Sequence, residues 1–184
     1  MTQPDPRDEL VEHLPALRAF ALSLTRNRAT ADDMMQDTVL KAWSNMDKFQ
    51  VGTNMRAWLF TILRNTYYSS RRKLKREVPD VDNVFSQNLS VKPEHDGRLQ
   101  MMDFKEALSQ LGDEQREALI LVGASGFSYE DAAEMCGVAT GTIKSRVNRA
   151  RARLAELMHL DDEAELEMTD AATMAVVGNP GMPS

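Results

Sequence analysis

Hydrophobic positions recur along most of the chain with the three-to-four-residue spacing of amphipathic α-helices, and strand-type alternation is weak. In the first part of the chain the pattern predicts helices over 7–25, 30–46 and 55–75. Asp33 stands three residues after Thr30, the spacing of a capping box, and the run 52–54 is a turn signal before the third helix. We expect these helices to form one domain over 7–76.

The helical spacing of hydrophobic residues is interrupted over 77–97 and resumes after it. Residues 77–97 carry Pro, Gly, Asp and Asn without apolar periodicity, as in a flexible linker that spans roughly 25 Å. Beyond it the pattern predicts helices over 99–111, 113–124, 128–136 and 140–158. They would form a second domain over 98–160, followed by an acidic, disordered tail over 161–184. The predicted fold class is all-α, with two small helical domains joined by a flexible linker.

Charge is informative only when it is followed along the chain. The 22 Lys and Arg against 28 Asp and Glu give a net charge of −6, which by itself argues against a nucleic-acid partner. However, residues 56–76 contain seven basic residues and no acid, and 142–153 contain five and no acid. Residues 154–184 contain seven acids and no Lys or Arg. Two basic islands favour DNA-facing surfaces, although either one alone could be a solvated helix face.

The sequence offers few residues for metal binding or catalysis. Cys136 is the single cysteine and the three histidines lie far apart, so the sequence predicts no disulfide, no metal site and no cofactor. No nucleophile–base arrangement is visible, which makes an enzyme the weakest interpretation. No apolar run approaches the ~20 residues that span a bilayer, and the N-terminus is unlike a signal peptide. We expect a cytoplasmic protein without a membrane partner.

The run 128–147 has the spacing of a helix-turn-helix, with the small Ala133 at the helix crossing and Gly137 in the turn. On the following helix, one face is apolar: Ile143, Val147, Ala150, Leu154 and Leu157. The remaining surface offers groups for base edges and phosphates: Lys144, Ser145, Arg146, Asn148, Arg149 and Arg151. A merely solvated basic helix is the alternative, and the helix-turn-helix spacing disfavours it.

The third predicted helix has two distinct faces. Its predicted core face comprises Met55, Trp58, Leu59, Ile62 and Thr66. The opposite face comprises Arg64, Tyr68, Arg71 and Lys75. For Phe60, Tyr67 and Tyr68 the sequence leaves core and surface positions equally open. Basic residues interleaved with aromatics suit a nucleic-acid strand with unstacked bases, because aromatic rings replace the lost base stacking.

The second predicted helix carries an apolar residue on its polar face. Leu40 projects among Asp33, Gln36 and Asp37, opposite the predicted core stripe. An exposed leucine alone means little. Surrounded by acids and an amide, it indicates a contact patch for a basic partner helix.

These elements, in this order, resemble the bacterial extracytoplasmic-function (ECF) RNA polymerase sigma factors. Residues 32–43 resemble the family's polymerase-clamp helix, 52–65 its reader of the promoter −10 element, and 126–151 its −35 reader. The phrases 52–65 and 119–128 further resemble the EcfG-type subgroup of the general stress response. Gly112 departs from the family pattern, which often has Pro there.

The resemblance implies a role for each set of residues. It places Asp33, Gln36, Asp37 and Leu40 on the clamp of core RNA polymerase. It implies that Asn65 helps to hold an extruded base of the −10 element and that the loop 48–56 forms part of the pocket. The basic face of the third helix would lie beside this pocket. It assigns −35 reading to Lys144, Ser145, Asn148 and Arg149, beside Arg146 and Arg151.

The implied function is to direct transcription initiation at stress-response promoters, without catalysis and without a cofactor. The subgroup implies core RNA polymerase, promoter DNA and a NepR-like anti-sigma factor as partners. It also implies release by a PhyR-type mimic that carries a receiver domain, and this sequence has no room for such a domain. Two alternatives remain open at this point: a DNA-binding regulator that works without polymerase, and a decoy that binds only the anti-sigma factor.

Overall fold

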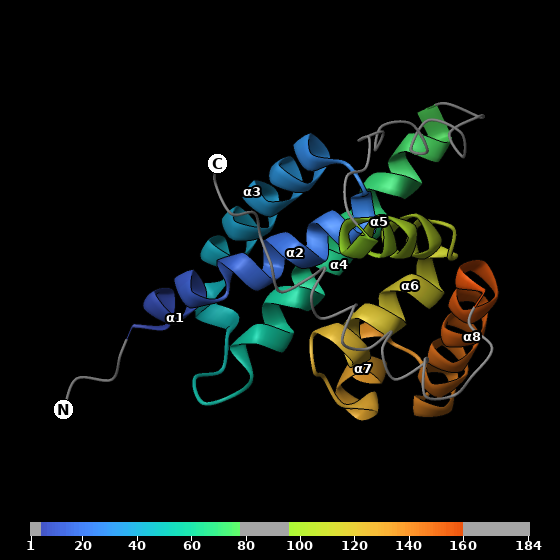
Figure 1. Cartoon of the computed structure of the whole chain (residues 1–184). Helices are drawn as coiled ribbons and strands as arrows, with labels where there is room; N and C mark the ends of the chain where they lie inside the picture. The colour runs from blue at the N-terminus through green and yellow to red at the C-terminus, as the bar shows by residue number, and fades with distance from the viewer. Residues whose placement is uncertain (1–4, 78–95, 160–184) are drawn as a thin grey trace. The chain divides into compact units, whose positions relative to one another are not determined.

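The computed structural model describes the backbone of residues 5–77 and 96–159, and its regular elements in these ranges are all helical (Figure 1). The chain divides into two compact units, Met1–Asn88 and Leu89–Ser184. The prediction of an all-α fold with two helical domains is confirmed. Most of the predicted linker and the predicted disordered tail lie outside the described residues. No helix within the described ranges is long and apolar enough to cross a membrane.

The first predicted helix is in fact two helices, α1 (Pro6–Glu12) and α2 (Leu14–Thr25). Asp5 caps α1 by accepting a hydrogen bond from the Arg7 backbone N–H at 2.9 Å. Pro15 lies in the first turn of α2, where its missing N–H is not needed. In a continuous helix the proline ring would clash with the carbonyl four residues earlier, so the chain breaks at His13.

The helix α3 (Arg28–Ser44) begins earlier than predicted and has a different cap. The Asn27 side-chain oxygen accepts a hydrogen bond from the Thr30 backbone N–H at 3.0 Å. The predicted capping box of Thr30 and Asp33 is therefore wrong, because Thr30 already lies inside the helix. A short 3₁₀ helix, η1 (Met46–Lys48), follows α3.

The long helix α4 (Met55–Glu77) packs against α1, α2 and α3. Its Phe60 ring stacks on Phe20 of α2, with 4.8 Å between ring centroids. The prediction of the core face is correct for Met55, Leu59 and Thr66. Trp58 and Ile62 are only half-buried, and three further residues fill the core: Phe60, Leu63 and Tyr67. The buried face is broader than predicted because several helices cover α4.

The second unit contains α5 (Asp96–Ser109), α6 (Asp113–Leu119), α7 (Tyr129–Cys136) and α8 (Thr140–Met158). The helix predicted over 113–124 changes character after α6 and continues as a π-helical segment, η3 (Ile120–Ala124). The Ser125 N–H donates to the Ile120 carbonyl at 2.8 Å, five residues back. In α7 the predicted helix-turn-helix start is capped by a reciprocal Ser128–Asp131 box, and Gly137 ends the helix with φ 67°.

The observed cap of α3 predicts that Asn27→Ala lowers the free energy of unfolding of the first unit by about 1 kcal/mol, because one helix N–H loses its partner. Both tryptophans, Trp43 and Trp58, lie in this unit, so their fluorescence during urea unfolding reports on it selectively. Asp33→Ala serves as the control and should leave the midpoint unchanged. An equal loss from Asp33→Ala would contradict the assignment.

Candidate nucleic-acid and polymerase interfaces

The orientation of α8 is set by its apolar face. Ile143, Val147, Ala150 and Leu154 are fully buried, as the spacing predicted, and Leu157 is half-buried. Four of the predicted −35 contacts are exposed: Lys144, Ser145, Asn148 and Arg149. Burial of the stripe therefore leaves two short hydrogen-bonding side chains pointing outward with a cation on either side. That arrangement suits base edges flanked by phosphates.

The other basic residues of α8 have internal contacts or are partly covered. Arg146 places Nη2 2.9 Å from Glu114 Oε2 on α6, and Arg151 is half-buried. Arg153 pairs with Glu156 of its own helix at 2.8 Å. Lys144 belongs to the exposed group, although its Nζ lies 5.7 Å from the centroid of the Tyr129 ring at the start of α7. The predicted −35 set thus divides into an outward group and residues with internal contacts.

The basic face of α4 carries stacked arginines. The Arg64 guanidinium lies 4.7 Å from the centroid of the Tyr68 ring, and Arg71 lies 5.7 Å from that of Tyr67. Arg71 also donates a hydrogen bond to the Tyr67 hydroxyl at 3.1 Å. Tyr67 is buried and meets Tyr68 edge-on, whereas Tyr68 is half-buried. Of the three aromatics that the sequence left open, Phe60 and Tyr67 are core residues and Tyr68 reaches the surface.

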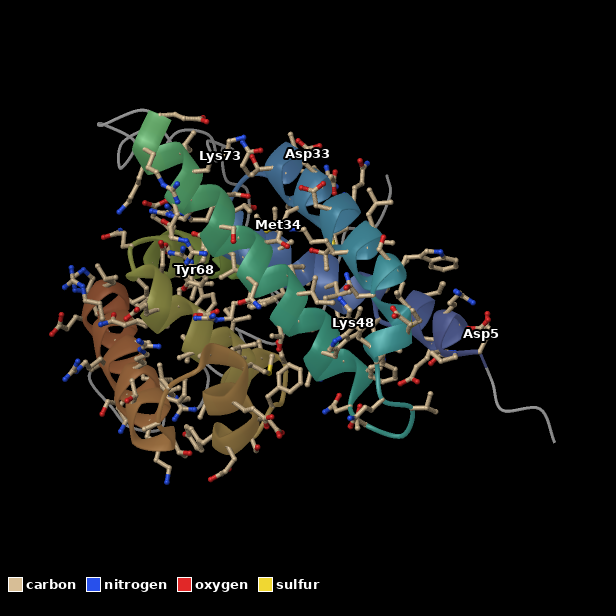
Figure 2. The ribbon with its side chains drawn as sticks, turned by 180° about the vertical axis from the view of Figure 1, so that it is seen from behind. Asp5, Asp33, Met34, Lys48, Tyr68 and Lys73 are labelled. Carbon is tan, nitrogen blue, oxygen red and sulfur yellow. The ribbon has the colours of Figure 1, made fainter. Side chains whose placement is uncertain are left out.

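The remaining members of the predicted −10 set, Asn65 and Lys75, are exposed on the same helix. Figure 2 shows Tyr68 and Lys73 along the length of α4. The structure therefore brings the predicted residues to one helix, with exposed polar groups next to cation–π pairs. Guanidinium groups that already lie over tyrosine rings can also stack on a nucleic-acid base.

The loop before α4 has a defined internal structure. The Thr53 hydroxyl donates to the Gln50 carbonyl at 2.7 Å, and Asn54 Oδ1 accepts from the Ala57 N–H at 3.0 Å. Gly52 has φ 90°, which other residues rarely adopt. The Phe49 and Trp58 rings lie 5.1 Å apart and fasten the loop to α4. The loop is thus held at the N-terminal end of the basic helix.

Arg56 begins the basic island of α4. Its guanidinium lies 5.3 Å from the centroid of the Phe60 ring, and burial lowers the pKa of Arg56. Arginine remains charged because its ordinary pKa lies far above neutrality. The positive charge of the island therefore extends from the loop to the end of α4.

The polar face of α3 has the exposure that the sequence predicted. The α3 patch, defined as Asp33, Gln36, Asp37 and Leu40, is exposed throughout, and Leu40 reaches 65%. Figure 2 shows Asp33 on the outer side of α3, while Met34 turns toward α4. Within the described ranges neither Asp33 nor Asp37 forms an ion pair. Both carboxylates are available to a partner.

The neighbouring carboxylate of Asp32 behaves differently. Arg18 Nε donates to Asp32 Oδ1 at 2.9 Å, across α2 and α3. This hydrogen bond lowers the pKa of Asp32 and raises that of Arg18. Adjacent aspartates in one sequence motif thus have separate roles, since Asp32 joins two helices and Asp33 faces outward.

The exposure of Trp43 was not predicted from the sequence. Trp43 is 52% exposed, three residues after Leu40, and the Arg7 guanidinium of α1 lies 4.9 Å from the centroid of its ring. The signal was its helical spacing from Leu40, which places both residues on neighbouring parts of the α3 surface. A large apolar contact thus extends the α3 patch toward α1.

Comparisons with known proteins match this architecture. Residues 10–77 match the family model of Sigma-70 region 2, and residues 101–154 match that of Sigma-70 region 4. The ECF RNA polymerase sigma factor EcfG of Rhodopseudomonas palustris (strain TIE-1) is 50% identical over 173 residues, covering 94% of this chain and 96% of the relative.

Two solved structures are also similar. The sigma factor RpoE, in complex with the anti-sigma factor NepR from Bartonella quintana, has a TM-score of 0.76 and 56% identity. That match covers 86% of this chain and 99% of RpoE. CnrH, in complex with the cytosolic domain of CnrY, has a TM-score of 0.61 and 27% identity, covering 84% of this chain and 88% of CnrH.

The two matched regions define the class, a sigma-70-type transcription initiation factor with one region in each helical unit. The chain belongs to the ECF RNA polymerase sigma factors. Members of this family initiate transcription and are not enzymes. The family membership disfavours both alternatives that the sequence left open, a regulator independent of polymerase and a pure decoy.

The contact between Phe49 and Trp58 predicts that Phe49→Ala loosens the loop 48–56 without unfolding α4. In a Trp43→Phe background, Trp58 is the remaining tryptophan, and acrylamide should quench its fluorescence more strongly once the Phe49 ring is removed. Val51→Ala is the matched control, because Val51 is exposed in the same loop. Unchanged quenching in Phe49→Ala would show that the ring does not hold the loop.

Proposed function

We propose that this sigma factor directs core RNA polymerase to stress-response promoters, using the first unit for the clamp and the −10 element and the second for the −35 element. The observation that carries the proposal is the outward face of α8, where Ser145 and Asn148 lie between the cations Lys144 and Arg149. A buried apolar stripe backs this face, so its direction is set by the fold.

Reading of the −35 element would follow from the size of the side chains on α8. Ser145 and Asn148 are short enough to let the helix enter the major groove, and both can donate and accept hydrogen bonds. Arg149 is long enough to reach a guanine edge, and Lys144, held near Tyr129, lies where a phosphate passes. Arg151 stands beside this face and is the further candidate for a phosphate contact.

Capture of the −10 strand would use the loop 48–56 and the basic face of α4. Asn65 is exposed and can bond the Watson–Crick edge of an extruded base. Arg64 and Tyr68 form a stacked pair beside it, and Arg71 and Lys75 continue the positive charge along the helix. An opened strand would therefore find hydrogen-bonding, stacking and phosphate partners on one element.

Docking on core polymerase would use the α3 patch. Leu40 supplies an apolar contact, and the carboxylates of Asp33 and Asp37 favour a basic helix as the partner. Gln36 adds a hydrogen-bonding group between them. Trp43, which enlarges the apolar area, belongs to the same contact in this proposal.

Regulation by a NepR-like anti-sigma factor is supported by the likeness to RpoE, which was solved in complex with NepR. Both core polymerase and an anti-sigma factor would require exposed protein-binding surface, and the α3 patch is a surface of this kind. The proposed place of action is the cytoplasm, where promoter DNA and polymerase are found.

The function is tested by run-off transcription with purified core polymerase. The chain should support specific initiation on genomic fragments, and mapping the starts should reveal a shared −10 and −35 sequence. A purified NepR-like protein should abolish the transcripts. If the chain neither associates with core polymerase nor yields specific starts, the proposal is wrong.

The exposure of Leu40 predicts that Leu40→Ala weakens association with core polymerase about tenfold or more, as expected for a central apolar contact, without lowering the unfolding midpoint. Leu22→Ala is the matched control, because Leu22 is an exposed leucine on α2. Affinity can be measured by competition for core polymerase with a labelled wild-type chain. Equal affinities for the two variants would exclude Leu40 from the interface.

The outward position of Arg149 predicts that Arg149→Ala costs about 1–3 kcal/mol on the preferred −35 sequence and relaxes the preference there. Arg153→Ala is the matched control, because Arg153 is paired with Glu156 on the same helix. Binding of holoenzyme to promoter variants measures both effects. A uniform loss across all sequences would reduce Arg149 to a phosphate contact.

A further inference from the structure

Arg146 differs from its neighbours on α8. Ser145 and Arg149 are exposed, but the Arg146 side chain is only 15% exposed. Its Nη2 lies 2.9 Å from Glu114 Oε2 on α6. The sequence grouped Arg146 with the −35 contacts because of its charge. In the structure its charged end is directed to a carboxylate of its own unit.

The α6 end of this ion pair is held in place. Arg116 is fully buried two residues after Glu114, and its Nη1 donates to the Leu111 carbonyl at 2.9 Å. Its Nη2 donates to Asp113 Oδ1 at 2.8 Å. These bonds link the first turn of α6 to Leu111, in the turn between α5 and α6. Glu114 therefore projects from a backbone that cannot easily shift.

The α8 end lies to one side of the apolar stripe. At about 100° per residue, Arg146 stands roughly 60° from Ile143 around the helix. The stripe of Ile143, Val147, Ala150 and Leu154 sets which face is buried, and Arg146 lies at the edge of that face. A directional contact beside the stripe adds resistance to rotation, since a guanidinium–carboxylate bond has a preferred geometry.

We propose that Arg146 is a positioning residue for −35 reading. Its ion pair with Glu114 fixes the rotation of α8 on α6, so that Ser145, Asn148 and Arg149 meet the base edges in register. Arg146 makes no phosphate contact in this assignment. The inference rests on the proposed function, because it requires that α8 reads the −35 element.

The two possible roles of Arg146 have different signatures. A phosphate contact releases counterions when DNA binds. Its loss therefore lowers the slope of log K against log salt concentration by about one and weakens binding to all sequences. A positioning contact leaves that slope unchanged and lowers the preference for the correct −35 sequence. Its effect also depends on Glu114, because neither residue can act without the other.

The test uses holoenzyme reconstituted from the full chain and core polymerase, on a mapped promoter and on the same promoter with a scrambled −35 element. The variants are Arg146→Met, which keeps the side-chain length, Glu114→Gln, and both together. Each single change should lower the ratio of the two affinities by about twofold to fivefold, the size expected for a partly exposed ion pair. The double variant should lose no more than either single one, and all salt slopes should equal that of wild type.

The controls separate the inference from the proposed function. Glu106→Gln removes an exposed carboxylate of α5 and should change nothing. Arg149→Ala should lower the preference for the correct −35 sequence. Glu114→Gln alters a mostly exposed side chain, so it keeps the test valid even if Arg146→Met unfolds the unit.

Three results would overturn the inference. A drop of about one unit in the salt slope of Arg146→Met would make Arg146 a phosphate contact. Losses that add in the double variant would show that the ion pair is not the source of the effect. An unchanged preference in Arg146→Met and Glu114→Gln, with a loss in Arg149→Ala, would refute the inference alone. If Arg149→Ala also has no effect, α8 is not the reader and the proposed function fails with it.

Discussion

Burial of one apolar face on each long helix decides where the positive charges of this protein point. On α8 the buried stripe from Ile143 to Leu154 leaves the opposite side to Ser145, Asn148 and Arg149. On α4 the Phe20–Phe60 stack and the buried Tyr67 have the same effect for the basic residues that follow the loop. Hydrophobic packing and the proposed recognition of nucleic acid therefore depend on the same helices, and a change in the core should alter the proposed interface.

The described acidic residues have both internal and external positions, whereas the basic surfaces of this chain of net charge −6 follow from the segregation of charge along the sequence. Asp32 and Glu114 each pair with an arginine of a neighbouring helix and so link two helices. Asp33 and Asp37 remain outside and give α3 a character opposite to that of α4. Under the proposed function, DNA and protein partners are recognised by different faces of one small unit, because like charges repel the wrong partner.

Residue spacing was sufficient to predict the helical class, the helix-turn-helix and the exposed Leu40, since each depends on local periodicity. It failed where one residue had several compatible roles. The chain breaks before Pro15 within one continuous apolar pattern, and Asn27 rather than the predicted Thr30 caps α3. The width of the buried face on α4 depends on how many helices cover it, and the contact of Arg146 with Glu114 joins residues 32 positions apart. The residue roles at promoter and polymerase are still predictions.

The π-helical segment η3 makes the stretch between α6 and α7 tolerant of one particular change in length. A π-turn accommodates one more residue than an α-turn in the same hydrogen-bonded span. The loss of a single residue from Ile120–Ala124 can therefore be absorbed as a regular α-turn, and the helix-turn-helix that follows keeps its register. A deletion of the same size inside the regular helix α8 has no such compensation, because it turns every later residue by about 100° around the helix axis. A change of one residue in length should therefore be tolerated in η3 and not in α8.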